Sequence, residues 1–347
     1  RMASIRLDEL SFRYPGAVED TLAPLSFSVE DGAAFSLLGA SGAGKTTLLN
    51  LLSGLLVPTS GRIFFDAHEV SMLAGRERNV AQVFQFPVLY ESMSVSENLA
   101  FPLRARKFDP VWIRQRVERI AAELEITQQL PLVAAQLSLF QKQLVAIGRA
   151  LVRPDVSVVL LDEPLTAVEP RMKWRLRQTL RRVQEELGVT MIYVTHDQTE
   201  ALTFADQVAV MADGGLLQVG TPEQIYSTPS HEFVGYFIGS PGMNFVAVEH
   251  LAQPLELLPN TCRVGFRPEW AVLCGGEDGQ LRGAVRSMQL AGTQGGIATG
   301  VVRIDMIAGE IAVRGRLDVD VGQSVGVHLQ HHLCYSAHGR LLTADDE

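Results

Sequence analysis

The strongest constraint on the fold of this chain comes from residues 39–47, which read Gly-Ala-Ser-Gly-Ala-Gly-Lys-Thr-Thr. A largely apolar run at 34–38 precedes them, and an apolar helical run at 48–56 follows them. A strand, a glycine-rich loop and a helix in this order present backbone N–H groups and a helix N-terminus to an anion. A glycine-rich turn beside a surface lysine is the alternative. The flanking strand and helix favour a phosphate-binding loop, and hence a nucleoside triphosphate as the ligand.

This loop supplies most of the predicted nucleotide contacts. Lys45 is expected to reach the β- and γ-phosphates, and the Thr46 hydroxyl is expected to ligate Mg²⁺. The other predicted nucleotide-binding residues of the loop are Gly39, Ser41, Gly42, Ala43, Gly44 and Thr47. Tyr14 is expected to stack on the adenine, although an aromatic residue there is a weak indication by itself.

Further polar residues follow apolar runs that we predict to be strands. The run at 156–161 leads to Asp162, a predicted Mg²⁺ ligand, and to Glu163, a predicted general base for the attacking water. The next apolar run leads to His196, which is expected to contact the γ-phosphate and hold that water. Gln85 follows a third run and is expected to touch Mg²⁺ and the water. A plain strand end and a structural histidine are the alternatives, which the phosphate-binding loop disfavours.

The order of the predicted elements divides the chain into two domains. Residues 1–238 alternate short apolar strands with amphipathic helices, which predicts an α/β layer architecture. Within this domain, a helical subdomain is expected at about 88–155. Residues 239–347 contain short β-rich runs separated by Gly and Asp, which predicts a small β-barrel.

Two helices have clear limits in the sequence. One begins at Asp109-Pro110, an N-cap followed by proline, with Ile113, Val117 and Ile120 on one face. The other runs from about 170 to 187 and ends before Gly188. The arginines of this second helix are predicted to form a solvated face, and they are Arg175, Arg177, Arg181 and Arg182.

Composition restricts the partners and the location. The formal net charge of −9 argues against nucleic acid as a partner. No stretch reaches the roughly 20 apolar residues of a membrane-spanning helix. The first residues lack the apolar core of a signal peptide, so a cytoplasmic location is expected. The three cysteines are widely spaced, which predicts reduced thiols rather than a metal site.

Taken in chain order, these motifs resemble those of the ATPase subunits of ABC transporters. The matching elements are Tyr14, the loop 39–47, Gln85, a signature-like segment at 137–151, Asp162-Glu163, a connecting loop at 166–169 and His196. The segments 84–103 and 265–269 are similar to those of importers of the maltose, glycerol-3-phosphate and glycerol type. The resemblance implies a P-loop ABC ATPase domain followed by an all-β, OB-like domain. It also implies ATP and Mg²⁺ as cofactors and ATP hydrolysis coupled to transport.

The resemblance further implies a set of partners. In this family two ATPase subunits enclose two ATP molecules, and each signature segment contacts the nucleotide of the other subunit, here through Ser138 and Gln141. The apolar positions at 86–93 and 99–103 are expected to receive a short helix from one of two membrane permease subunits, with ordinary core packing as the alternative. A periplasmic or lipid-anchored substrate-binding protein would act indirectly. The chain would then lie peripherally on the cytoplasmic face of the bacterial inner membrane.

The signature segment departs from the family pattern. Leu-Ser-Gly-Gly-Gln is replaced by Leu-Ser-Leu-Phe-Gln at 137–141. Leu139 and Phe140 add bulk where glycines allow a helix N-terminus to approach a phosphate. We therefore expect a second, non-identical ATPase subunit as partner, and a small polyol or sugar as cargo, with glycerol as the narrowest expectation. A closely packed variant signature that works normally is the alternative.

Other functions remain possible at this level. A largely non-hydrolytic regulatory ABC subunit is disfavoured because Glu163 and His196 are both present. A soluble, non-transport ABC ATPase is disfavoured because neither a long coiled-coil insert nor a second ATPase cassette occurs. A P-loop kinase would leave the signature-like segment unexplained.

Overall fold

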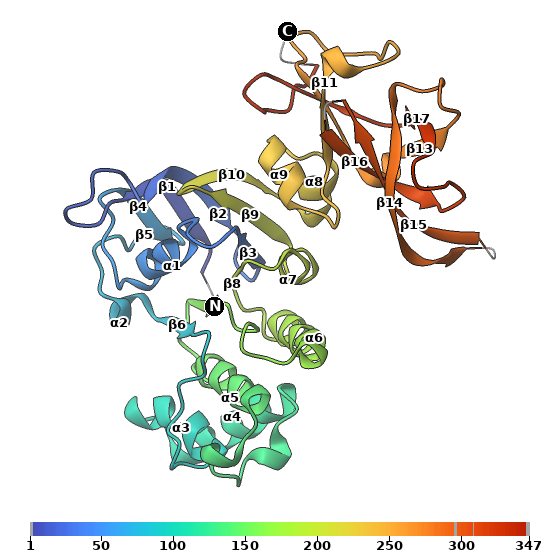
Figure 1. Cartoon of the computed structure of the whole chain (residues 1–347). Helices are drawn as coiled ribbons and strands as arrows, with labels where there is room; N and C mark the ends of the chain where they lie inside the picture. The colour runs from blue at the N-terminus through green and yellow to red at the C-terminus, as the bar shows by residue number, and fades with distance from the viewer. Residues whose placement is uncertain (1–2, 295–296, 308, 345–347) are drawn as a thin grey trace. The chain divides into compact units, whose positions relative to one another are not determined.

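The computed structural model describes residues 3–294, 297–307 and 309–344. The chain divides into two compact units, residues 1–222 and residues 223–347 (Figure 1). Helix α9 (Glu232–Phe237) and nearly all of α8 (Pro222–Ser227) therefore group with the second unit, whereas the sequence placed both in the first domain. The predicted domain limits at 238 and 239 stay a prediction.

The first unit is built around a six-stranded sheet in the order β10-β9-β3-β8-β7-β6. All neighbours are parallel except β10 and β9. These strands are β3 (Ala34–Leu38), β6 (Val80–Val83), β7 (Val158–Asp162), β8 (Met191–Thr195), β9 (Gln207–Ala212) and β10 (Gly215–Gly220). Strands β3 and β8 are buried along their whole length, which explains why they read as continuous apolar runs.

A second, antiparallel sheet completes the strands of this unit, in the order β2-β1-β4-β5. Its strands are β1 (Ile5–Phe12), β2 (Leu22–Val29), β4 (Ser60–Phe65) and β5 (His68–Glu69). One hydrophobic core includes residues of both sheets and of helix α1 (Lys45–Ser53). The phosphate-binding loop, through Ala43, therefore rests on a core that both sheets share.

Seven helices of the first unit are described, and two of them match the sequence expectation closely. The remaining helices besides α1 are α2 (Gly75–Arg78), α3 (Val95–Ala105), α4 (Pro110–Glu123), α5 (Leu139–Leu151), α6 (Pro170–Leu187) and α7 (Gln198–Phe204). The predicted start of α4 is confirmed, since the Asp109 carboxylate accepts the backbone N–H of Val111 and Trp112. The predicted end of α6 is confirmed by Gly188, which adopts a left-handed conformation.

The predicted solvated face of α6 was wrong for one arginine. Arg177 is 8% exposed and packs into the interior, whereas Arg175 and Arg182 form ion pairs with Glu125. The stem of an arginine carries enough apolar surface to pack inside while its charge finds polar groups. Charge alone therefore did not separate the buried position from its exposed neighbours.

The second unit is all-β apart from α8, α9 and short turns, which is consistent with an OB-like domain. One sheet has the order β11-β12-β18 and the other β13-β17-β14-β15-β16, and every pair is antiparallel. The strands are β11 (Asn244–Ala247), β12 (Arg263–Phe266), β13 (Ala271–Cys274), β14 (Leu281–Gln294), β15 (Ile297–Met306), β16 (Gly309–Arg316), β17 (Ser324–Leu329) and β18 (Leu333–Tyr335).

Arg267 links the helices of this unit to its strands by hydrogen bonds. Its side chain is fully buried, and its guanidinium donates to the backbone carbonyls of Tyr226, Gly235 and Ile238. The guanidinium also lies over the Tyr226 ring, 4.1 Å from its centroid. The helical segment that the sequence assigned to the ATPase domain is therefore attached to the strands of the second unit.

Among the described residues, no helix is both long enough and apolar enough to cross a bilayer.

Candidate nucleotide-binding and hydrolysis site

The phosphate-binding loop connects the end of β3 to the start of α1, as the sequence predicted. Gly44 precedes α1 with a φ of 91°, a left-handed conformation that favours glycine. At Gly39 an added Cβ atom would lie 2.4 Å from the carbonyl oxygen of Met211 in β9. The loop therefore passes directly against a neighbouring strand, and only glycine allows that approach.

Lys45 closes the loop on itself. Its ammonium Nζ donates to the carbonyl oxygens of Gly39 (2.7 Å) and Ala40 (2.8 Å). Burial lowers the pKa of Lys45, while the carboxylates of Glu163 and Asp162 act in the opposite direction. A buried ammonium in this position is poorly solvated, so an anion such as a phosphate would improve its electrostatic environment.

The other predicted nucleotide contacts surround this lysine. Thr46 lies in the first turn of α1 with an exposed side chain, and Ser41 and Gly42 are exposed in the loop. The Tyr14 hydroxyl lies 3.4 Å from the Thr47 hydroxyl, which brings the predicted adenine contact beside the loop. Tyr14 is 42% exposed, so its ring is available for stacking.

Asp162 ends β7 in register with Val194 of β8. Because β3, β7 and β8 are parallel, their carboxyl ends lie at the same edge of the sheet, where ligands bind in open α/β sheets. Burial and, next, the charge of Glu163 raise the pKa of Asp162, whereas Lys45 lowers it. A carboxylate that is costly to ionise alone becomes favourable beside a bound cation.

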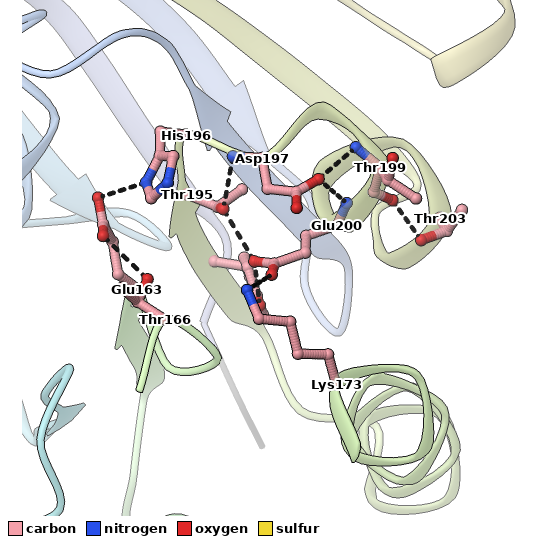
Figure 2. Close-up of polar contacts among 10 residues, drawn as sticks. Glu163, Thr166, Lys173, Thr195, His196, Asp197, Thr199, Glu200 and Thr203 are labelled. Atoms are coloured by element: carbon pink, nitrogen blue, oxygen red, sulfur yellow. Dashed lines mark hydrogen bonds and ion pairs between the residues drawn. The ribbon is translucent and has the colours of Figure 1, made fainter. Parts of the chain in front are cut away.

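Glu163 and His196 meet at this edge, as Figure 2 shows. The Glu163 Oε1 atom lies 3.2 Å from Nδ1 of His196, and its Oε2 accepts a hydrogen bond from the Thr166 hydroxyl at 3.0 Å. Glu163 adopts a left-handed φ of 46°, and its backbone N–H donates to the Val194 carbonyl at 3.0 Å. The adjoining strand thus holds Glu163 in an uncommon conformation, a situation typical of functional residues.

Gln85 follows β6, the strand that pairs with β7. Its side chain is half-buried. The preceding carbonyl, that of Phe84, accepts a hydrogen bond from the Gln143 amide of α5 at 3.3 Å. This segment is therefore attached to the signature-like helix, while the contact of Gln85 with Mg²⁺ stays a prediction.

Ser138 and Gln141 form a reciprocal cap at the N-terminus of α5. The Ser138 hydroxyl accepts the backbone N–H of Gln141 at 3.3 Å, and the Gln141 side-chain oxygen accepts that of Ser138 at 2.9 Å. Leu139 is 41% exposed, whereas Phe140 lines a cavity of about 270 Å³ beside Met172. The bulky residues therefore leave the helix start intact.

The described residues contain no cluster of three or more His, Cys, Asp or Glu side chains that could hold a metal by themselves. Mg²⁺ does not need one, because it keeps several waters and commonly binds one carboxylate together with substrate phosphates. Asp162, with its raised pKa, and the exposed Thr46 hydroxyl fit that kind of site.

The sequence reasoning missed a buried group behind His196. Glu200 of α7 accepts hydrogen bonds from Tyr193 and Thr195 and pairs with Lys173 of α6. A glutamate four residues after the histidine, in a short predicted helix, was the available signal. Its burial depends on how α6 and α7 pack on β8, which no local pattern reveals.

Comparison with known proteins gives consistent matches. The sequence model of the ABC transporter family matches residues 22–166. The trehalose/maltose import ATP-binding protein MalK of Thermococcus litoralis is 43% identical over 251 residues, which cover 71% of this chain and 67% of that protein. The sn-glycerol-3-phosphate import ATP-binding protein UgpC of Rhizobium meliloti is 36% identical over 329 residues, which cover 92% and 94% respectively.

A solved structure is similar as well. CbiO1 of Clostridium perfringens, described as part of the ABC transporter complex CbiONQ, superposes with a TM-score of 0.61 at 29% identity. The match covers 65% of this chain and 91% of that chain.

These comparisons correct the predicted partner. The expectation of a second, non-identical ATPase subunit was wrong, because the relatives are import ATP-binding proteins of a kind that does not support an unequal pair. The two residues also leave the start of α5 intact, since Ser138 and Gln141 cap it despite the bulk of Leu139 and Phe140. The altered signature therefore does not require a different subunit.

Proposed function

This chain belongs to the ABC transporter family of ATP-binding proteins, and we propose that it powers import of a sugar, a sugar-alcohol phosphate or a small polyol. Its activity is ATP hydrolysis coupled to transport. The observation that carries the proposal is the 3.2 Å contact between Oε1 of Glu163 and Nδ1 of His196. It lies at the carboxyl ends of the parallel strands, where the loop with Lys45 begins.

The charges of the site support a separate role for each residue. Lys45 and the backbone N–H groups of the loop bind the β- and γ-phosphates, and Tyr14 stacks on the adenine. Glu163 accepts the proton of the attacking water, while His196 orients that water against the γ-phosphate. The hydrogen bond from Thr166 supports the Glu163 carboxylate on the side away from the histidine.

Thr46, Asp162 and Gln85 would hold Mg²⁺, which would neutralise the charge that develops on the phosphates. The contribution of Asp162 is an ionised carboxylate. Burial raises its pKa, but a bound cation would favour the charged form and offset that effect. Ser138 and Gln141 would contact the nucleotide from a second copy.

We infer a pair of identical subunits that enclose two ATP molecules. Each copy carries a complete set of site residues and an intact cap at α5, which supports equal sites. The exposed apolar residues Phe86 and Val88 follow Gln85 and suit the docking of a permease helix. With a permease partner, the chain would lie peripherally on the cytoplasmic face of the membrane.

The names of the relatives favour trehalose, maltose or sn-glycerol 3-phosphate as the class of cargo. Glycerol, the narrowest expectation from the sequence, belongs to the same proposal. The decisive assay is uptake of each labelled compound by proteoliposomes that contain the chain with its permeases and binding protein. Uptake of none of these compounds would refute the proposed cargo class.

ATP hydrolysis has its own test. The purified chain should hydrolyse Mg-ATP, and Glu163→Gln should reduce kcat at least 100-fold while ATP binding persists. The matched control is Glu185→Gln, which changes an exposed carboxylate of α6 that pairs with Arg181. Hydrolysis by Glu163→Gln at the wild-type rate would remove Glu163 from the mechanism.

A further inference from the structure

Glu200 is a buried carboxylate beside the strand that leads to His196. Its side chain is 3% exposed, and it lies in the first turn of α7. Its Oε2 atom accepts hydrogen bonds from the hydroxyls of Tyr193 (3.0 Å) and Thr195 (2.9 Å). Its Oε1 atom lies 3.2 Å from the ammonium of Lys173 (Figure 2). The two oxygens therefore bond to different elements, β8 on one side and α6 on the other.

Thr195 carries the connection from Glu200 to the histidine. Its hydroxyl donates to Glu200 and accepts the backbone N–H of Asp197 at 3.0 Å. The Asp197 carboxylate caps α7 by accepting the backbone N–H of Thr199 (2.8 Å) and of Glu200 (3.2 Å). These bonds hold the backbone next to His196, and the Glu200 carboxylate takes part in them through the Thr195 hydroxyl.

Lys173 connects the same carboxylate to the loop that follows Glu163. It lies in the first turn of α6, and its backbone N–H donates to the Glu169 carbonyl at 3.2 Å. Residues 163–169 join β7 to α6, and Thr166 within them donates to Glu163. A displacement of this loop therefore moves Lys173, and with it the ion pair to Glu200.

Tyr193 keeps this arrangement constant with pH. Burial and, next, the charge of Glu200 raise the pKa of Tyr193 well above its ordinary value. The hydroxyl therefore stays protonated under working conditions and donates to Glu200 without interruption.

We propose that Glu200 is a positioning residue for ATP hydrolysis, which sets the place of the His196 imidazole opposite Glu163. Its ion pair with Lys173 makes that place depend on the loop 163–169. The inference rests on the proposed function, because the Glu163–His196 pair must act on ATP. Loss of Glu200 should therefore slow the chemical step more than it weakens ATP binding.

The test compares three variants and one control variant of the full chain with the wild type by ATP turnover, ATP affinity and the NMR signals of the His196 imidazole, and a fifth variant assigns those signals. Glu200→Gln keeps the shape but removes the charge, and Thr195→Val removes the hydroxyl that connects the carboxylate to the turn. Lys173→Met removes the ion pair. The control, Glu185→Gln, removes an exposed carboxylate from α6. His196→Gln identifies the imidazole signals.

We expect Glu200→Gln and Thr195→Val to reduce kcat about tenfold, to leave the Kd for ATP within twofold, and to shift the His196 signals. Lys173→Met should reduce kcat about threefold, and should add little to Glu200→Gln because both act through one contact. If Glu200→Gln does not fold, the other two variants decide by the same criteria. Variants that lower the melting temperature but leave kcat and the His196 signals unchanged would reduce Glu200 to a packing role.

The two proposals fail in distinguishable ways. A wild-type chain that neither binds nor hydrolyses ATP refutes the proposed function. A wild-type chain that hydrolyses ATP, and whose Glu200→Gln and Thr195→Val variants match it in kcat, refutes only the role of Glu200.

Discussion

The Arg149 guanidinium donates to the Val88 carbonyl at 2.7 Å and lies over the Tyr90 ring, 4.9 Å from its centroid. Arg149 belongs to α5, which begins at the capped Ser138, while Val88 follows Gln85. The signature-like helix and the segment proposed to face the permease are therefore joined by a charge-assisted bond. Movement of one should be transmitted to the other.

Replacement of this arginine should uncouple the two segments. Arg149→Met removes one charge-assisted hydrogen bond and one cation–π contact, together about 2 kcal/mol. We expect stimulation of ATP turnover by the permeases to fall about tenfold, with ATP affinity changed less than twofold. Arg119→Met, on the exposed face of α4, is the control. Equal stimulation in both variants would show that the bond transmits nothing.

The bulky residues of the altered signature should affect the rate of ATP turnover. If Leu139 and Phe140 hold α5 away from the nucleotide of the second copy, the double change Leu139→Gly with Phe140→Gly should raise kcat several-fold. Glycine lets the helix N-terminus approach a phosphate but costs about 1 kcal/mol per residue in helix stability. Turnover should be measured beside the melting temperature. A slower and less stable variant would instead make Phe140 part of a tolerated packing arrangement.

Asp162 should make the nucleotide-free protein sensitive to pH. Its folded pKa lies above the ordinary 3.8, so its contribution to stability is present below that value and lost as pH rises through the folded pKa. Asp162→Asn lacks this loss, and its melting temperature should exceed that of the wild type at pH 7 but not at pH 3.5. With Mg-ATP the order should reverse, because only the carboxylate holds the cation.

Asp206 offers a control of opposite sign. Burial acts to raise the pKa of Asp206. Hydrogen bonds from Arg181 and from the Ala34 backbone outweigh burial, so the pKa of Asp206 is lowered. Its stabilising contribution is therefore present above the ordinary pKa and lost as pH falls through the folded value. Asp206→Asn should be less stable than the wild type at pH 7, and the difference should shrink in acid. Parallel pH profiles for both asparagine variants would contradict the assignment.

Arg267 should matter for the stability of the second unit rather than for ATP chemistry. Arg267→Met leaves buried carbonyls of Tyr226 and Ile238 without their donor, which should cost about 3 kcal/mol. Arg263→Met removes the pair between the exposed Arg263 and the largely buried Glu232, and it should cost less than Arg267→Met. Calorimetry should show a lowered transition for the first variant alone, while the Kd for ATP stays unchanged in both.

Sequence reasoning placed the site best where chemistry depends on short local patterns. The loop at 39–47 and the strand end at Asp162 are such patterns, because parallel strands bring their carboxyl ends to one edge. Glu200 was not assigned and Arg177 was assigned wrongly, because their environments depend on how helices pack on their neighbours. The partner was inferred from two side chains at α5, although the backbone cap that they flank is preserved.

The position of β3 within its sheet also sets when the site can form during synthesis. β3 ends at Leu38, but its neighbours β8 and β9 begin at Met191 and Gln207. The carbonyl of Met211, which packs against Gly39, comes from the later of these two strands. Since the chain leaves the ribosome from its N-terminus, the loop lacks both flanking strands until that region has emerged. A nascent chain is therefore expected to bind nucleotide at this loop only after β9 has emerged.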